Sequence, residues 1–474
     1  MKKLLSYTFV LTVLAVSSCR KIQEDVIVYN VGGGTDTTTT NENVVLEGKI
    51  SADRTLKANY VYKIRGIVYV VNNAKLTIEP GTVIQGEKGA TSRGTLVITR
   101  GSQLIADATK DKPVVFTSDQ PSPQRGDWGG IVILGNAKTN ASYNGVAGVG
   151  SVEGGVNNAE SLGLYGGAID TDNSGVLRYV RIEYAGYAYL PDNELNGLTL
   201  AGVGNATVID YVEIFKANDD AIECFGGSVN LKHTIMISTL DDDFDSDNGW
   251  SGKVQWGIVM RDSAVADISK SNSFESDNDA NGSSLLPQTG GVYSNITIIG
   301  PRQNLTNIGN SLFNAGAHIR RNTSISIFNS AILGYPTGIL IDASKGTPTD
   351  NNITANTLLI QNTLIAGSAT PVSYAASTSA PTGWTSASAS EWFLTPAYGN
   401  GIVATNDEVK LAAAFNYANP DFTPLDGSPL LSGASFTNTK LTGLTPVNYR
   451  GAVGPAGSAD ADWWKGWSKL NIGL

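Results

Sequence analysis

Short apolar runs alternate with turn-forming residues along most of the chain. The runs VVNNAKLTIEPGTVIQG, GTLVITRGSQLIADAT, KPVVFTS and WGGIVILGNA are rich in Val, Ile and Thr, and Gly, Asn, Asp or Pro bounds them. None keeps a helical period, and 53 glycines supply tight turns at short intervals. The pattern predicts many short strands joined by turns.

One strand-like motif recurs. LRYVRIEYAG, IDYVEIFKAN and LKHTIMISTL share a core that begins near Tyr179, Tyr211 and His233. The last offset is 22 residues, and the longer first offset of 32 fits a coil that carries the insertion YAYLPDNELNG. Such a β-rich period is typical of a solenoid, in which each coil buries its apolar side by stacking on its neighbours. We predict an all-β, right-handed parallel β-helix, with an antiparallel sandwich or a propeller as the alternative.

The 22-residue offset also predicts a register. The aligned pairs are Tyr211 and His233, Ile214 and Met236, Asp219 and Asp241, Asp220 and Asp242, and Ile222 and Phe244. Parallel strands lie about 4.8 Å apart, so the paired aspartates should stack on neighbouring coils as a compact carboxylate patch. Like charges at that spacing need a cation, turn amides or raised pKa values to offset their repulsion.

The N-terminus predicts export. Lys2 and Lys3 precede an apolar run, and the sequence VSSC then resembles the lipobox of bacterial lipoproteins, with Cys19 as the acylated residue. An ordinary secretory signal is the alternative. The stretch VGGGTDTTTTNEN that follows has no apolar periodicity and predicts a flexible tether.

These features divide the chain into four parts. The tryptophans of DWWKGWSKL, at 463, 464 and 467, are expected to cap the last coil, although stacking on sugar rings is an alternative. The predicted parts are a lipoprotein signal peptide (1–18), a lipidated tether (19–43), the parallel β-helix (44–390), and C-terminal coils with a Trp-rich cap (391–474).

The net charge and the cysteine content limit the kinds of molecule that the protein is expected to bind. A formal net charge of −10 should repel nucleic acid. If Cys19 carries lipid, Cys224 is left without a disulfide partner, and its place between Ile222 and Phe225 predicts a buried structural thiol. The expected partners are a membrane, reached through the lipid, and a glycan ligand, on whose sugar rings the tryptophans could stack.

Several blocks resemble one family. GDWGGIVILGNA, NSGVLRYVRIEYAG, NELNGLTLAGVG, DDAIECFGG, DDDFDSDNGWSGKVQWG and FESDNDANGS, with the ending VNYRGAVG to DWWKGWSKL, resemble Bacteroidota surface lipoproteins with a pectin-lyase-like β-helix. The pair Glu24 and Asp25 resembles the signal that sends such lipoproteins to the outer face of the outer membrane. The resemblance implies a fold and a cell-surface location rather than an activity. Cys224 departs from the family pattern, which has tryptophan there.

Three aspartate-rich stretches suggest a hard cation. LDDDFDSDNG, DNDANG and DTDNSG place alternating oxygen ligands ahead of a glycine, as calcium sites do. None is an EF-hand, because Gln288 and Val254 stand where a bidentate glutamate belongs. Turn closure by side chains is the alternative, and we favour it for DTDNSG. The predicted calcium ligands are Asp241, Asp243, Asp245, Asp247, Asp277, Asp279 and Asn281.

The same aspartates could serve an enzyme. Turn-borne carboxylates of β-helix glycosidases act as proton donor and as base or nucleophile, and a lyase adds a basic residue. The Gly-His-Gly turn and Arg-x-Lys motif of β-helix polygalacturonases are absent, and His233 and His318 are expected to be packed strand residues. The candidate catalytic residues are Asp219, Asp220, Asp241, Asp242, Asp243, Lys253 and Arg261.

The sequence therefore favours a lipid-anchored surface β-helix that serves as a binding, adhesive or scaffold module toward glycans. A calcium-assisted polysaccharide lyase or glycoside hydrolase is the alternative. A groove in which carboxylates converge with a basic residue near Asp242 would favour the enzyme, and carboxylates buried in turns would favour a scaffold.

Overall fold

A computed structural model describes residues 43–89, 93–190, 193–307 and 309–472. The predicted signal peptide, Cys19, the Glu24 and Asp25 pair, and the tether up to residue 42 lie outside these residues. No helix within the described ranges is long and apolar enough to span a membrane.

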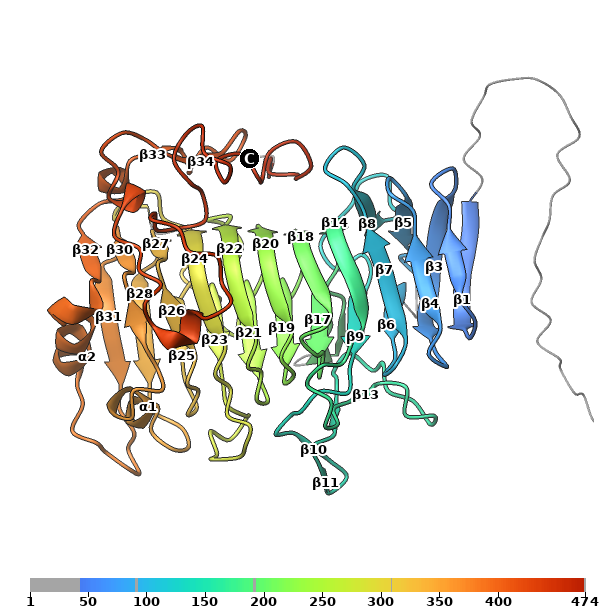
Figure 1. The fold of residues 1–474 in the computed structure, drawn as a ribbon, viewed down its shortest axis with the longest axis horizontal. Helices are drawn as coiled ribbons and strands as arrows, with labels where there is room; N and C mark the ends of the chain where they lie inside the picture. Colours follow the sequence, from blue (N-terminus) through green and yellow to red (C-terminus); the bar gives the residue numbers. More distant parts are fainter. Residues whose placement is uncertain (1–42, 90–92, 191–192, 308, 473–474) are drawn as a thin grey trace, which may run out of the picture. The chain divides into compact units, whose positions relative to one another are not determined.

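Parallel strands stack coil upon coil along one axis (Figure 1). Twenty-six strands form one hydrogen-bonded sheet, in which each strand pairs with its counterparts on the preceding and following coils. The fold is a right-handed parallel β-helix, as predicted, and each coil contributes to three faces. The predicted register is confirmed, since Ile214 pairs with Met236 and Ile222 pairs with Phe244.

The first and second faces share several long strands, which bend between them. The first face contains β2 (Arg54–Leu56), β4 (Lys75–Ile78), β7 (Gln103–Asp107), β26 (Ser326–Phe328), β29 (Ile360–Gln361), and the first halves of β14 (Gly175–Glu183), β18 (Val208–Phe215), β20 (Asn230–Ile237), β22 (Lys253–Met260) and β24 (Val292–Ile299).

The second face contains the other halves of those long strands. Its remaining strands are the first parts of β1 (Asn43–Ile50) and β3 (Val61–Val70), then β5 (Val83–Gly86), β8 (Val114–Ser118), β27 (Ala331–Leu333), β30 (Leu364–Ala366) and β32 (Gly401–Val403).

The third face follows after a turn. It contains the ends of β1 and β3, then β6 (Thr95–Ile98), β9 (Gly130–Leu134), β17 (Leu198–Ala201), β19 (Ile222–Phe225), β21 (Phe244–Asp247), β23 (Phe274–Ser276), β25 (Ala315–Ile319), β28 (Thr337–Asp342) and β31 (Thr370–Ala375).

The bend between the first two faces explains the recurring motif. Tyr179, Tyr211, His233 and Trp256 occupy the bend of successive coils with positive φ, between 47° and 63°. A bulky residue in that conformation costs about 1–2 kcal/mol, and ring stacking offsets the cost. The ring of Tyr211 lies 4.3 Å from that of Tyr179 and 4.2 Å from that of His233. His233 is thus a packed strand residue, as expected.

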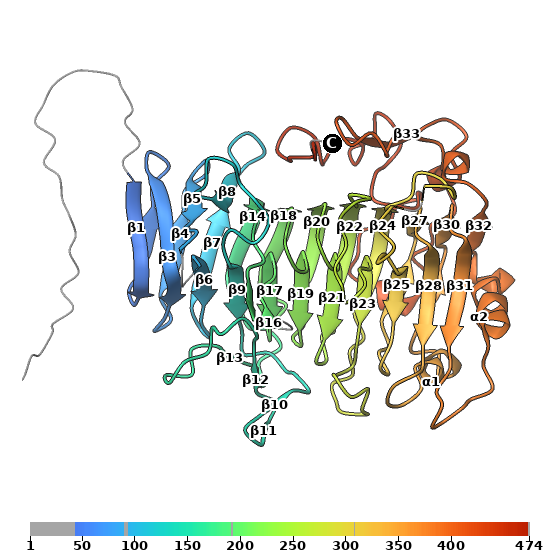
Figure 2. The same ribbon diagram turned by 180° about the vertical axis from the view of Figure 1, so that it is seen from behind.

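Two segments cover the outside of the solenoid. The insertion consists of residues 136–174 and 184–197, on either side of the solenoid strand β14, and it extends from the third face (Figure 2). The C-terminal segment, residues 404–472, runs back along the second face and also packs on the first face around Leu441, and we call it the strap (Figure 1). The insertion holds β10 (Ser142–Tyr143), β11 (Val146–Ala147), β12 (Gly150–Ser151), β13 (Leu164–Tyr165), β15 (Ala188–Leu190) and β16 (Asn193–Glu194).

The strap corrects the predicted cap. Trp463 and Trp467 pack against the stacked rings of Tyr211 and His233, in the middle of the solenoid, rather than on its last coil. Helix α2 (Ser386–Phe393) instead buries Phe393 in the core at the C-terminal end. The strap and the coils before it also hold α1 (Asp350–Thr354), η1 (Pro396–Tyr398), η2 (Asn406–Val409), β33 (Leu411–Ala413), β34 (Asp421–Pro424), η3 (Pro429–Leu431) and η4 (Thr439–Leu441).

Candidate functional site

The outward side of the third face changes character along the axis. Ala201 and Phe225 point outward on neighbouring coils and pack against the insertion in a small apolar cluster. The next residue in this column is Asp247. The adjacent column reads Glu223, Asp245, Glu275 and His318. The apolar surface therefore gives way to charge at the two adjacent coils that carry β19 and β21.

A ladder of Asp and Asn side chains fixes the turn before this face. Asp220 Oδ1 accepts a hydrogen bond from the backbone N–H of Asp242, at 2.9 Å. Asp242 in turn accepts from the N–H of Asn272, and Asn272 accepts from the N–H of Ala315. This ladder confirms that Asp220 and Asp242 stack on adjacent coils, and it gives each a structural role in closing a turn.

Five carboxylates converge beside the ladder, and we call them the carboxylate cluster: Asp219, Asp220, Glu223, Asp241 and Asp245. Oxygens of Asp219, Asp220 and Asp241 lie within 4.8 Å of one another, and the same holds for Asp220, Glu223 and Asp245. Asp220 belongs to both groups. Sequence reasoning missed Glu223, although it precedes Asp245 by the same 22 residues that align the aspartates.

Burial and mutual repulsion change the acidity of the carboxylate cluster. Asp220 is only 7 % exposed. Burial, together with the neighbouring carboxylate of Asp219, raises its pKa well above the usual range. Burial raises the pKa of Asp241 to about 6. The same two causes raise the pKa of Asp219, Glu223 and Asp245 well above their usual values. Ionising all five carboxyl groups therefore requires a compensating charge.

The donor set suits a hard cation. Calcium takes six to eight oxygen ligands at about 2.3–2.6 Å, and carboxylates are its preferred protein ligands. The Oδ1 atom of Asp241 is buried and has no hydrogen-bond partner among the described residues, which is costly for a polar atom without a ligand. The protein ligands would come from two overlapping sets of three carboxylates, one of Asp219, Asp220 and Asp241 and the other of Asp220, Glu223 and Asp245. A bound cation would also coordinate hydroxyl or carboxylate oxygens of a ligand.

Asp243 lies apart from this cluster and corrects two predictions. Its carboxylate and the guanidinium of Arg261 are both fully buried, with the Nη1 atom 3.0 Å from Oδ2. Asp243 also accepts a hydrogen bond from Ser273. Neither Asp243 nor Arg261 can reach a polysaccharide from the interior, so Arg261 is no catalytic base and Asp243 is neither a catalytic acid nor a calcium ligand on the surface.

Lys253 is also far from the predicted role. It begins β22 on the first face, where Nζ donates a hydrogen bond of 2.5 Å to the backbone oxygen of Thr442 in the strap. The basic side chains that do lie on the charged part of the third face are Arg320 and Arg321, which the sequence analysis did not single out.

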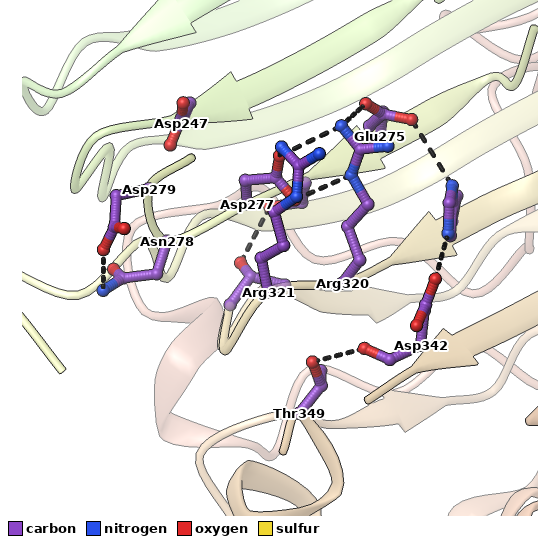
Figure 3. Close-up of polar contacts among 12 residues, drawn as sticks. Asp247, Glu275, Asp277, Asn278, Asp279, Arg320, Arg321, Asp342 and Thr349 are labelled. Carbon is purple, nitrogen blue, oxygen red and sulfur yellow. Dashed lines mark hydrogen bonds and ion pairs between the residues drawn. The ribbon is translucent and has the colours of Figure 1, made fainter. Parts of the chain in front are cut away.

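Arg320 and Arg321 hold an ionic cluster on the next coils (Figure 3). Arg320 donates to both oxygens of Asp277, at 2.8 and 3.1 Å, and also contacts Glu275. Arg321 donates to Asp277 at 2.5 Å. Asp277 is thus held by two arginines and is unavailable to a metal ion, contrary to its predicted role.

His318 is a mostly buried residue of strand β25, as expected, and it extends the ionic cluster. Its ring lies outside the apolar core, with Nε2 3.0 Å from Asp342 and Nδ1 3.4 Å from Glu275. These carboxylates raise the pKa of the imidazole despite its burial. Hydrogen bonds from His318 and Ser344 lower the pKa of Asp342 to about 2, although burial acts in the opposite direction.

The remaining predicted ligands close turns. Asp279 Oδ1 accepts hydrogen bonds from the backbone N–H groups of Asn281, at 2.9 Å, and Ser283, at 3.3 Å. Asn281 is exposed, and Asp247 lies between the two charged clusters with its pKa raised to about 8 by burial. The seven predicted calcium ligands therefore separate, and only Asp241 and Asp245 belong to the carboxylate cluster.

A family model describes most of the solenoid. The model named pectate-lyase like beta helix domain matches residues 48–403. The chain belongs to this family. Comparison with curated proteins and with solved structures found no significant match. Membership of the pectate-lyase-like β-helix family fits a glycan-related protein.

The C-terminal boundary of the matched domain lies between the two charged clusters and the strap. The carboxylate cluster and the ionic cluster lie within the pectate-lyase-like domain, whereas the strap begins where the domain ends. Cys224 also lies within the domain; it is 3 % exposed and packs in the core, which confirms the predicted structural thiol.

Proposed function

We propose that this protein is a lipid-anchored β-helix of the bacterial outer surface that binds glycans through a cation held by the carboxylate cluster. The observation that carries the proposal is the convergence of two sets of three carboxylates that share Asp220. One of them includes the Oδ1 of Asp241, which has no hydrogen-bond partner in the described part of the chain. The lipobox-like VSSC and the tether supply the anchoring part, and the resemblance to Bacteroidota surface lipoproteins supports the location.

The arrangement of bases favours binding over cleavage. A lyase needs a basic side chain that is free to take a proton beside the substrate. Arg261 is paired in the interior, Lys253 lies under the strap, and Arg320 is held between Glu275 and Asp277. Because these three basic residues are engaged, the cation site suits reversible coordination of sugar oxygens.

A calcium-assisted polysaccharide lyase or glycoside hydrolase is the second candidate. The family model favours it, since the domain is named for its likeness to pectate lyase. The raised pKa of Asp241, about 6, would also let that residue carry a proton near neutral pH, as a general acid must.

A polysaccharide panel tests the binding role. The mature protein should retain one or more acidic or neutral polysaccharides in calcium and release them in EDTA. The Asp241→Asn variant should lose retention, whereas Asp170→Asn, a turn aspartate paired with Lys138, should keep it. The appearance of new reducing ends or of unsaturated uronate products would show that the protein cleaves the polysaccharide, and the enzyme would then be the better assignment. Retention that is equal with and without calcium would exclude the cation.

The anchor has its own test. In a bacterial host, Cys19→Ala should move the protein from the membrane fraction to the soluble fraction of the cell envelope, because acylation supplies the membrane affinity. Cys224→Ala is the matched control, since this thiol is buried in the core, and it should leave fractionation unchanged. If Cys19→Ala stayed in the membrane fraction, acylation of Cys19 would not be what anchors the protein.

A further inference from the structure

A pocket lies where the strap begins, away from both charged clusters. It encloses about 380 Å³ between the end of β27, helix η2 and the β33–β34 hairpin. Leu333, Phe415 and Leu425 form its apolar wall, and Asp407, Lys410 and Asp426 are exposed around them. Ligand pockets typically have this size and this mixture of an apolar wall with a few polar groups.

Hydrogen bonds to backbone oxygens hold the pocket in shape. Leu425 N–H donates to the oxygen of Lys410 at 2.8 Å, and Ser428 Oγ donates to the oxygen of Val409 at 2.6 Å. Asn406 Nδ2 donates to the backbone oxygens of Arg302 and Gln303, both at 2.8 Å, which ties η2 to the coil below. The lining residues are therefore positioned before any ligand arrives.

One feature of the lining is unexplained by folding alone. Leu425 is a large apolar side chain with 48 % of its surface exposed. An exposed apolar wall among the charged groups of Asp407, Lys410 and Asp426 is unfavourable in water and would gain from a ligand that has both an apolar and a hydroxyl side.

We propose that this pocket is a second glycan site, which binds a neutral sugar ring without a cation. The apolar side of a pyranose ring would lie against Phe415 and Leu425, and its hydroxyls would donate to Asp407 and Asp426 and accept from Lys410. Two carboxylates against one ammonium disfavour a uronate. The site goes beyond the proposed function, because its residues other than Leu333 follow the matched domain and lie outside the carboxylate cluster.

Calorimetric titration with neutral monosaccharides and their short oligomers, carried out in EDTA, tests the site. At least one neutral sugar should bind the wild-type protein, and the matching uronate should bind more weakly. Asp426→Ala and Phe415→Ala should each weaken binding at least about tenfold, since each removes a direct contact. Glu391→Ala, an exposed carboxylate on α2, is the matched control and should bind like wild type.

The outcomes separate this site from the carboxylate cluster. Asp241→Asn should leave neutral-sugar binding in EDTA unchanged. Loss of calcium binding at the carboxylate cluster and loss of sugar binding at the pocket are therefore independent results. Asp426→Ala should unfold at the wild-type temperature because the side chain is exposed. Three results would overturn the proposal: no binding by any neutral sugar tested, wild-type affinity in both Asp426→Ala and Phe415→Ala, or tighter binding of uronates than of neutral sugars.

Discussion

The second and third faces of the solenoid have similar interiors and opposite exteriors. On the second face, outward residues such as Phe215, Ile237 and Met260 are apolar, and the strap covers them. On the third face, the column of Ala201 and Phe225 is apolar beneath the insertion, and it continues as Asp247 where that cover ends. The inward pattern sets the fold, whereas the segment that covers each face decides its outward residues.

The comparison also separates two uses of charge. Under the strap, Glu213 accepts hydrogen bonds from the N–H of Lys469 at 2.8 and 2.9 Å, so it fastens the cover. On the third face, the carboxylate cluster faces outward beside turns and has too few donors for its oxygens. A buried acid with a partner stabilises structure, and an acid group without one is suited to a ligand.

The strongest test of the cover removes a strap anchor. Trp467 is 1 % exposed and packs against Tyr179 and Tyr211, so Trp467→Ala should lower the free energy of unfolding by about 3–5 kcal/mol. Chemical denaturation measures this. Ile268→Ala, at a position that is 87 % exposed, should change it by less than about 0.5 kcal/mol. Equal effects would mean that the strap does not stabilise the second face.

A second test distinguishes interior acids from surface acids. Arg261→Leu leaves the carboxylate of Asp243 buried and unpaired, and it should cost about 3–5 kcal/mol. Adding Asp243→Asn should recover part of that loss, because the uncompensated charge is gone. Denaturation of the single and double variants gives both values. If the double variant is no more stable than Arg261→Leu, the pair is not an isolated ion pair.

Much of the fold could be predicted from the sequence because the coil repeats. The 22-residue offset aligned Ile222 with Phe244 and Asp220 with Asp242, and in the structure these residues lie on adjacent coils. Burial of apolar side chains in a period-2 strand leaves little freedom in the register. The path of the strap could not be predicted, because its contacts with Tyr211 and His233 join residues more than 200 positions apart and follow no repeat.

The site could be predicted only in part, for a related reason. A run of aspartates does not show which side chains turn inward, and the partner that draws Asp243 inward is Arg261, on the following coil. Asp277 was assigned to a metal because Arg320 and Arg321 are distant in sequence. Glu223 lies outside the aspartate-rich turns, and only the outward alternation of β19 marks it.

The pH dependence of stability tests the covered face further. Burial raises the pKa of Glu213 to about 8. A raised pKa means that the folded state binds the proton more tightly, so this contribution is complete below about pH 4.5 and disappears as the pH rises through 8. The wild type should lose about 3 kcal/mol between pH 5 and pH 8 relative to Glu213→Gln. If the free energy of unfolding changed with pH in the same way in the wild type and in Glu213→Gln, the raised pKa of Glu213 would be contradicted.

The smallest expected difference lies within the third face. Asp277→Asn should cost about 2 kcal/mol, because it removes the acceptor of two arginines. Asp241→Asn should leave stability in EDTA unchanged or slightly higher, since it relieves repulsion in the carboxylate cluster. Thermal and chemical unfolding of both variants measure the contrast. Equal losses would show that Asp241 is held by protein contacts rather than poised for a ligand.

Calcium titration followed by calorimetry tests the central claim most directly. The wild type should bind calcium, Asp220→Asn should bind at least about tenfold more weakly while its Oδ1 still accepts from Asp242, and Asp170→Asn should match the wild type. Free calcium at one hundred times the dissociation constant should then stabilise the wild type by about 2.7 kcal/mol. No binding at millimolar calcium, or equal binding by Asp220→Asn, would contradict a cation site on the third face.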